Sequence, residues 1–261
     1  MNQNAAHGWD GHVHIFDRDA PIAQGHYAPE HHTLSEIESL AAQNGMAHLV
    51  LVQPSVYGHD NALILQALKR STGQHRGVVV LSHEETDEEL REWHALGVRG
   101  VRYNLVSPVG NRMSDWAHWR ETWAPRLRAL GWHVEWYAKA EQLPQLAQWQ
   151  RECGLPFVLD HLGGMNTEAI KNETYWQALD MLAQGGAWIK LSAGYRLGLS
   201  APYDLQALQL DRILQIFCSR CLWGSDWPHT GLAEDQKPNY AQTLRQISSK
   251  IGFTQASQLY S

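Results

Sequence analysis

Short apolar runs recur along the chain, and a stretch with helical character separates each run from the next. Eight runs occur, at residues 8–14, 47–53, 77–81, 98–103, 132–137, 156–161, 187–192 and 222–226. Several are almost continuously hydrophobic, which is typical of strands that are buried on both faces. Strands that alternate with helices predict a parallel sheet.

The intervening stretches carry signals for helix starts. Thr33 and Glu36 have the spacing of a capping box, Asp60 is placed to cap the next helix, and acidic residues follow Thr86. The predicted helices cover about residues 33–44, 60–69, 86–96, 114–130, 141–153, 173–183, 204–218 and 237–251.

Eight strand–helix units favour an α/β protein that closes into a (β/α)8 TIM barrel, a fold of about 250 residues. An open doubly wound sheet is the alternative, but it would normally carry a glycine-rich turn after its first strand. The turn here reads Asp-Arg-Asp. No linker interrupts the pattern, so we expect one domain over residues 1–261.

Composition narrows the possible partners. The net charge of -6, from 21 basic and 27 acidic residues, argues against nucleic acid. No apolar run is long enough for a membrane span, and the three cysteines do not form a disulfide framework, so a cytoplasmic protein is expected. Trp116, Trp119 and Trp123 on one predicted helix suit either a homodimer contact or packing of the helix on the barrel.

Polar residues gather where the predicted strands end, which is where barrel active sites lie. His12 and His14 are two apart on the first strand, so their imidazoles share one face. The later strands add Gln53, Ser55, Arg102, Asn104, Glu135, Tyr137, His161, Lys190, Ser192, Arg196 and Asp226. Any one of them has a plainer explanation, such as a helix cap, but the whole set is hard to explain as packing.

The residue types suggest hydrolytic chemistry. Asp226 ends an apolar strand and is our candidate general base for water. Paired imidazoles can ligate a metal or donate hydrogen bonds to a substrate oxygen, and His161 could complete their cluster. Arg102 could hold a substrate carboxylate or pair with an acidic residue of a neighbouring strand, and the sequence leaves both open.

Four motifs carry a family resemblance: Asp10-Gly-His-Val-His14, Gly100-Val-Arg-Tyr-Asn104, Leu159-Asp-His-Leu-Gly163 and Trp223-Gly-Ser-Asp-Trp-Pro228. Together they resemble the amidohydrolase superfamily, in the branch of the 2-pyrone-4,6-dicarboxylate and sugar lactonases. The resemblance implies a distorted barrel that opens the lactone ring of a carboxylated small molecule. It implies that Asp226 activates water, that His12, His14 and His161 polarise the carbonyl, and that Arg102, Arg196, Tyr27 and Tyr137 bind substrate.

The chain departs from the pyrone dicarboxylate pattern in its cationic residues. Gly164 stands where the resemblance leads us to expect an arginine. The resemblance also leads us to expect a basic pair in the loop directly after the fourth strand, where only Arg112 is basic. With fewer cationic residues, the substrate is expected to be a lactone with one carboxylate or a sugar-acid lactone.

A metal is the second open point. The fourth strand offers no bridging lysine or glutamate, so a two-metal site is not expected. We expect that no metal is required. The alternative is a single divalent cation such as zinc at His12, His14, His161 and Asp226. A metal-dependent decarboxylase on the same barrel and a non-catalytic carboxylate-binding barrel are the other functions to be separated by experiment.

Overall fold

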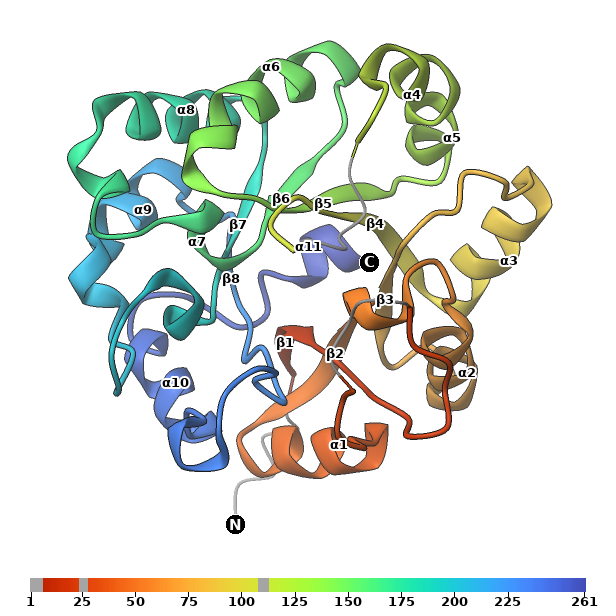
Figure 1. Cartoon of the computed structure of the whole chain (residues 1–261), viewed down its shortest axis with the longest axis horizontal. Coiled ribbons are helices and arrows are strands. Elements are labelled where there is room, and N and C mark those ends of the chain that lie inside the picture. The colour runs from red at the N-terminus through yellow and green to blue at the C-terminus, as the bar shows by residue number, and fades with distance from the viewer. Residues whose placement is uncertain (1–6, 24–27, 108–112) are drawn as a thin grey trace.

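The computed structural model describes residues 7–23, 28–107 and 113–261. Its eight parallel strands pair in chain order and form one (β/α)8 barrel, which confirms the predicted fold (Figure 1). The strands are β1 (Gly8–Val13), β2 (Met46–Val52), β3 (Arg76–Val79), β4 (Val98–Asn104), β5 (His133–Tyr137), β6 (Phe157–Leu159), β7 (Trp188–Leu191) and β8 (Cys221–Trp223).

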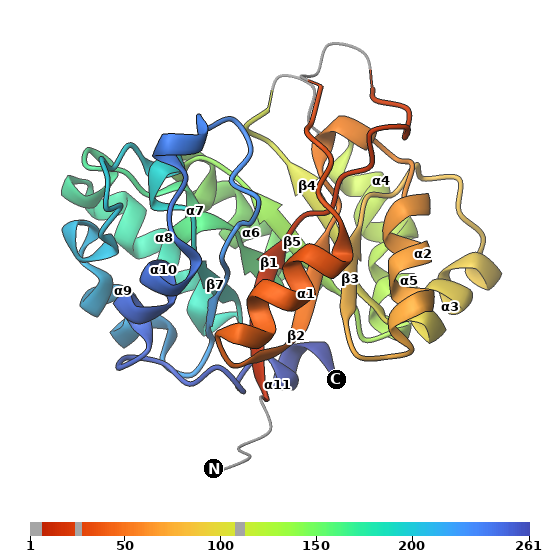
Figure 2. The same cartoon turned by 90° about the horizontal axis from the view of Figure 1, so that it is seen from below.

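Helices surround the strands on the outside of the barrel (Figure 1). They are α1 (Leu34–Gln43), α2 (Ala62–Ser71), α3 (Asp87–Leu96), α4 (Trp116–Thr122), α5 (Ala124–Ala129), α6 (Leu143–Cys153), α8 (Glu173–Gln184), α9 (Leu210–Phe217) and α10 (Tyr240–Ile247). The last helix, α11 (Ser257–Tyr260), lies at the end where the strands begin (Figure 2). There, Arg76 at the start of β3 donates a hydrogen bond to the carbonyl oxygen of Tyr260 at 2.6 Å.

The barrel closes where the chain beyond β8 meets β1. The backbone N–H of Asp226 donates to the carbonyl oxygen of His12 at 2.9 Å, and that of His14 donates to Trp227 at 2.8 Å. These two hydrogen bonds fix Asp226 beside both histidines, although the residues are more than 200 positions apart in the chain.

Several local predictions are confirmed. Thr33 forms the predicted capping box with Glu36. The helix predicted from Thr86 is present as α3, and Thr86 also forms a capping box there with Glu89. The predicted cap at Asp60 is wrong by one position, because the N-cap of α2 is Asn61, whose side chain makes no capping hydrogen bond. Asp60 precedes it, and its carboxylate accepts from the backbone N–H of Ala62 at 3.0 Å.

Other predicted boundaries are wrong. The helix expected at 114–130 is two helices, α4 and α5. Pro125 lies in the first turn of α5 and has no N–H to continue the hydrogen bonding of α4. The helix expected at 204–218 is divided by Gln209, whose φ of 55° is left-handed, and only α9 remains α-helical. The helix expected at 237–251 starts at Tyr240, capped by Asn239, and ends at Ile247.

The tryptophans of α4 mainly serve the packing of helices on the barrel. Trp119 and the adjoining Trp123 are buried, and Trp116 stacks on Trp119 and on Trp149 of α6. Trp116 is partly exposed, and a homodimer contact there stays a prediction. Within the described residues, no helix combines the length and hydrophobicity needed to cross a membrane.

Candidate active site

The end of β1 brings two histidines together in the barrel. Both side chains are buried, and their Nε2 atoms lie 3.2 Å apart. Nδ1 of His14 lies 2.8 Å from the carbonyl oxygen of Val52. A carbonyl oxygen only accepts, so the hydrogen of this imidazole is on Nδ1 and its Nε2 faces His12 as a lone pair. Burial lowers the pKa of His12 well below its usual value, and Lys190 lowers it further.

Asp226 completes the cluster from beyond β8. Its Oδ1 lies 3.3 Å from Nε2 of His14 and 3.5 Å from Nε2 of His12. Its Oδ2 accepts hydrogen bonds from Nε of Arg196 at 2.7 Å and from the hydroxyl of Tyr195. Burial alone would raise the pKa of this carboxyl, but the Arg196 guanidinium and the nearby histidines hold it well below the usual range. Asp226 is therefore a carboxylate at neutral pH.

His161 enters the cluster from a left-handed turn after β6. All four residues of the short element α7 (His161–Gly164) have positive φ, a conformation that Gly163 and Gly164 adopt without strain. This turn places the His161 ring 5.0 Å from that of His12, with Nδ1 2.8 Å from the hydroxyl of Ser192. Burial lowers the pKa of His161 to about 4, so the ring is neutral at pH 7.

A buried ionic layer lies behind the histidines. Arg102 donates to Oδ2 of Asp160 from Nη2 at 2.8 Å and from Nε at 3.0 Å, and its Nε lies 3.5 Å from Glu135. Lys190 pairs with Glu135, and its Nζ lies 3.4 Å from Oδ1 of Asp160. Of the two alternatives left open for Arg102, the ion pair describes its contacts: Glu135 lies on the neighbouring strand β5, and Asp160 directly follows β6.

The remaining predicted residues lie around this centre. Tyr137 packs edge-on against His161, with ring centroids 5.0 Å apart. Gln53 donates to the carbonyl oxygen of Asp60 at 2.7 Å, and Asn104 accepts from two backbone N–H groups of its own loop, so both brace loops. Ser55 begins a short 3-10 turn after β2. The predicted Tyr27 and Arg112 lie outside the described residues.

Sequence reasoning missed Asp160 and Tyr195 as parts of the site. Asp160 directly precedes His161 in a motif that was recognised, so its position carried a signal. Tyr195 lies on a 3-10 turn after β7 and reaches Asp226 only through the fold.

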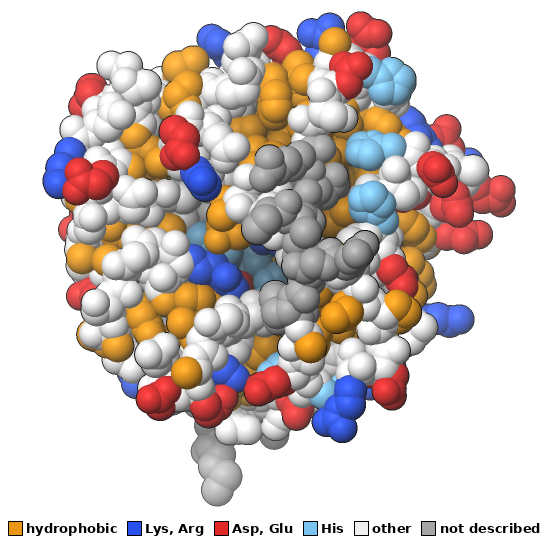
Figure 3. All heavy atoms as spheres, viewed as in Figure 1, with side chains coloured by type: hydrophobic (Ala, Val, Ile, Leu, Met, Phe, Trp, Pro, Cys, Tyr) orange, Lys and Arg blue, Asp and Glu red, His pale blue; other side chains and the backbone are white. Residues whose placement is uncertain are grey.

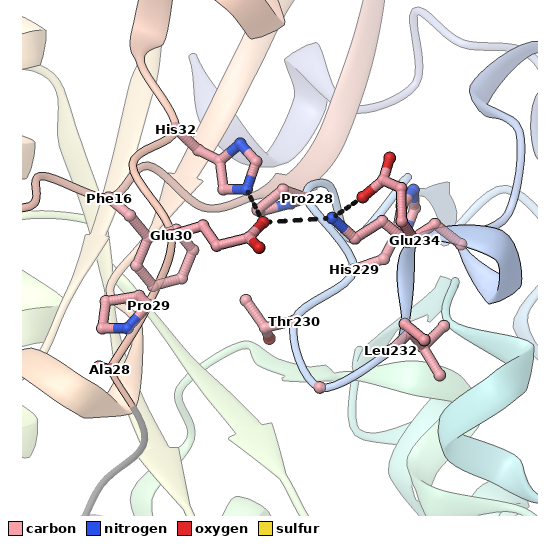
Figure 4. A pocket seen from close by; sticks show the side chains of 13 residues that line it. Phe16, Ala28, Pro29, Glu30, His32, Pro228, His229, Thr230, Leu232 and Glu234 are labelled. Atoms are coloured by element: carbon pink, nitrogen blue, oxygen red, sulfur yellow. Dashed lines mark ion pairs between the residues drawn. The ribbon is translucent and has the colours of Figure 1, made fainter.

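The face shown in Figure 3 is hollowed near its centre, where Lys or Arg and His side chains gather. A pocket of about 240 Å³ lies nearby, between the loops that follow β1 and β8 (Figure 4). Thr230 lines this pocket and accepts a hydrogen bond from Nη2 of Arg196 at 3.1 Å. In the same pocket, Glu30 lies 3.5 Å from His32 and 3.6 Å from Lys237.

The cluster also fits a single divalent cation in residue type and spacing. Nε2 of His12, Nε2 of His14 and Oδ1 of Asp226 are separated by 3.2, 3.3 and 3.5 Å. Ligands on a tetrahedral zinc ion with bonds near 2.0–2.1 Å lie about 3.3–3.5 Å apart. His161 belongs to a wider group with His12 and Asp226, whose ligand atoms lie within 4.8 Å of one another.

A parallel barrel with histidines and an aspartate at the carboxyl ends of its strands is typical of barrel enzymes, whose active sites lie at that end. A family model described as amidohydrolase matches residues 9–249. The chain belongs to this amidohydrolase family.

Two curated relatives are lactone hydrolases. A 2-pyrone-4,6-dicarboxylate hydrolase of Comamonas testosteroni is 33% identical over 248 residues, which cover 88% of this chain and 79% of the relative. A 4-sulfomuconolactone hydrolase of Rhizobium radiobacter is 30% identical over 234 residues, covering 88% and 78%. These relatives support a hydrolase that acts on lactones.

Solved structures agree with this assignment. A probable 2-pyrone-4,6-dicarboxylic acid hydrolase from Acinetobacter baumannii, with citric acid bound, has a TM-score of 0.87 and 27% identity and covers 97% of this chain and 99% of its own. An amidohydrolase from Burkholderia multivorans with bound zinc has a TM-score of 0.71 at 22% identity, covering 97% and 96%, and shares the fold.

Proposed function

We propose that this chain hydrolyses the ring ester of a carboxylated lactone, with Asp226 as the general base. The observation that carries the proposal is the placement of Asp226. Its carboxylate is buried, and among the described residues Oδ1 has no hydrogen-bond partner, while Oδ2 is held by Arg196. An ionised oxygen in this position can accept a proton from water.

The reaction follows from these positions. Oδ1 of Asp226 takes a proton from water while the water oxygen attacks the lactone carbonyl carbon. The developing oxyanion is stabilised by hydrogen bonds from His12 and His161. The ring C–O bond then breaks, and the leaving oxygen receives the proton from Asp226, which gives a hydroxy acid. His14, whose Nδ1 donates to Val52, accepts the Nε2 hydrogen of His12 in the free site. His12 shares this hydrogen with the oxyanion as the negative charge develops.

Arg196 links catalysis to a carboxylate on the substrate. Its side chain is 22% exposed, whereas that of Asp226 is fully buried, so an incoming anion can reach the guanidinium. Because Arg196 lowers the pKa of Asp226, a substrate carboxylate that draws the guanidinium away makes Asp226 a stronger base. A carboxylated lactone therefore activates the group that attacks it. Tyr137, Arg102, Gln53, Ser55, Asn104 and Tyr27 stay our predictions for binding its other polar groups.

We propose that turnover requires no metal. The residues that would hold a divalent cation are His12, His14, His161 and Asp226, and a bound cation would supply Lewis-acid polarisation of the carbonyl.

The test compares lactones in the presence and absence of a chelator. The purified protein is mixed with 2-pyrone-4,6-dicarboxylate, a monocarboxylate muconolactone, a sugar-acid lactone and a neutral lactone, and ring opening is followed by ultraviolet absorbance or acid release. We expect chelator-independent hydrolysis of a carboxylated lactone, with a kcat/KM at least a hundredfold above that of the neutral lactone.

Other outcomes overturn parts of the proposal. Loss of activity with chelator and its return with zinc would contradict metal-free turnover. A preference for the sugar-acid lactone would move the substrate to that alternative. Release of carbon dioxide from an unsaturated acid, only with metal, would favour a decarboxylase. Binding without turnover of any lactone would indicate a carboxylate-binding barrel.

A further inference from the structure

The hydrogen on His12 can be located from its contact with His14. Nδ1 of His14 donates to the carbonyl oxygen of Val52, so Nε2 of His14 is an acceptor. Nε2 of His12 lies 3.2 Å from that acceptor, within hydrogen-bond distance. The contact is a hydrogen bond only if the hydrogen of His12 is on Nε2.

The opposite side of the His12 ring gives the same answer independently. Nζ of Lys190 lies 3.1 Å from Nδ1 of His12 at hydrogen-bonding geometry. An ammonium group only donates, so Nδ1 of His12 must be the acceptor. Oδ1 of Asp160 is the competing partner at 3.2 Å, yet it has no hydrogen-bond partner among the described residues. A directed chain therefore runs from Lys190 through His12 and His14 to Val52.

We propose that Lys190 is a positioning residue that holds His12 in the tautomer with hydrogen on Nε2 and thereby weakens cation binding at the cluster. A metal ligand must present a lone pair, so zinc at Nε2 of His12 would require the hydrogen to move to Nδ1 and to bond Asp160. Lys190 occupies Nδ1 and opposes that change. The inference rests on the proposed function only for the use of the Nε2 hydrogen in oxyanion stabilisation.

The position of Lys190 makes it suited to this role. Its side chain is fully buried on β7, and its pairing with Glu135 of β5 holds the ammonium beneath His12. Glu135 also lies 3.5 Å from Arg102, so the layer that supports Lys190 is itself fixed by ion pairs.

The experiment reads the tautomer and zinc affinity directly. Long-range proton–nitrogen spectra of the ¹⁵N-labelled, metal-free protein distinguish the two neutral imidazole tautomers, and a His12→Gln variant assigns the signal. Zinc affinity is measured by calorimetry in the same samples. The variants are Glu135→Gln as the matched control and Lys190→Met/Glu135→Gln, which removes the buried charge pair together and leaves neither charge alone.

We expect hydrogen on Nε2 of His12 in the unaltered protein and in Glu135→Gln. In the double variant we expect hydrogen on Nδ1 and zinc binding about 10–100-fold tighter than in Glu135→Gln, the range typical of outer-shell changes at metal sites. Hydrogen on Nδ1 in the unaltered protein would overturn the proposal even if both variants fail to fold. Tighter zinc binding without a change of tautomer would also overturn it, since loss of positive charge would then explain the affinity. Neither readout depends on turnover, so a failure of the lactonase assignment is recorded separately.

Discussion

Replacing Asp226 with asparagine tests the proposed base with little disturbance of its surroundings. The amide oxygen can take the place of Oδ2 and accept from Arg196 and Tyr195. The amide NH2 then takes the place of Oδ1 and can donate to Nε2 of His14, 3.3 Å away. The hydrogen bonds of the site survive, whereas the group that accepts a proton from water is lost.

The expected effect on turnover follows from the role assigned to Asp226. A positioned general base contributes about 10²–10⁴ in rate, or about 3–5 kcal/mol in activation free energy. We therefore expect kcat for a carboxylated lactone to fall by that factor. Binding of an unreactive aromatic dicarboxylate should be unchanged or up to about tenfold tighter, because Arg196 no longer pairs with a competing anion.

Stopped-flow absorbance of the lactone measures kcat, and calorimetry measures binding of the dicarboxylate. Asp211→Asn is the matched control, because this carboxylate on α9 is 70% exposed and pairs with Lys250 away from the site. An Asp226→Asn enzyme with kcat within tenfold of the unaltered enzyme would refute the role of Asp226 as base. A parallel loss of binding and turnover would instead assign it a structural role.

Three further predictions concern stability, each measured by urea unfolding. Burial raises the pKa of Asp10 to about 6, so its stabilising contribution is present below pH 4 and is lost as pH rises through 6. The free energy of unfolding of Asp10→Asn, relative to that of the unaltered protein, should therefore rise by about 3 kcal/mol between pH 4 and pH 7. A difference that does not change with pH would contradict this. Arg102→Met leaves Asp160 without its closest cation and should cost about 3–5 kcal/mol, whereas a loss under about 1 kcal/mol would assign Arg102 to substrate alone. Gly164→Ala should lower the free energy of unfolding by about 2–4 kcal/mol, because φ is 70° and the new Cβ would lie 2.1 Å from the carbonyl oxygen of Ala138. Gly198→Ala is the control, since φ is 78° but the space around the new Cβ is open, and it should cost about 1 kcal/mol. Equal costs would exclude the steric contact.

The eight strands could be predicted because each leaves its own short apolar run, and capping boxes such as that of Thr33 are local signals. The gathering of His12, His14, His161 and Asp226 could be predicted from one rule, that strand ends converge in a barrel. The break in the helix at Pro125 was also encoded locally, but the hydrophobic period continues across it and hid the boundary.

Partner choice could not be predicted in the same way. Arg102 pairs with Asp160, which directly follows β6 and lies 58 positions later in the chain. The sequence alone does not distinguish that carboxylate from a substrate carboxylate. The hydroxyl of Tyr195 reaches Asp226 from a 3-10 turn whose direction depends on the packing of the whole barrel. Long-range pairing of this kind is decided by tertiary geometry and leaves no periodic signal.

The close approach of the backbone at Gly164 to the segment after β5 limits how substrate specificity can change during evolution. A cationic side chain at this position, which the family resemblance leads us to expect, would collide with the backbone of Ala138 and with Lys139, whose Cα would lie 2.8 Å from the new Cβ. A single substitution of Gly164 by arginine therefore requires the segment after β5 to shift as well. The main-chain conformation therefore disfavours a positive charge at position 164, and a second contact to a substrate carboxylate there would need a different conformation of the loop after β5.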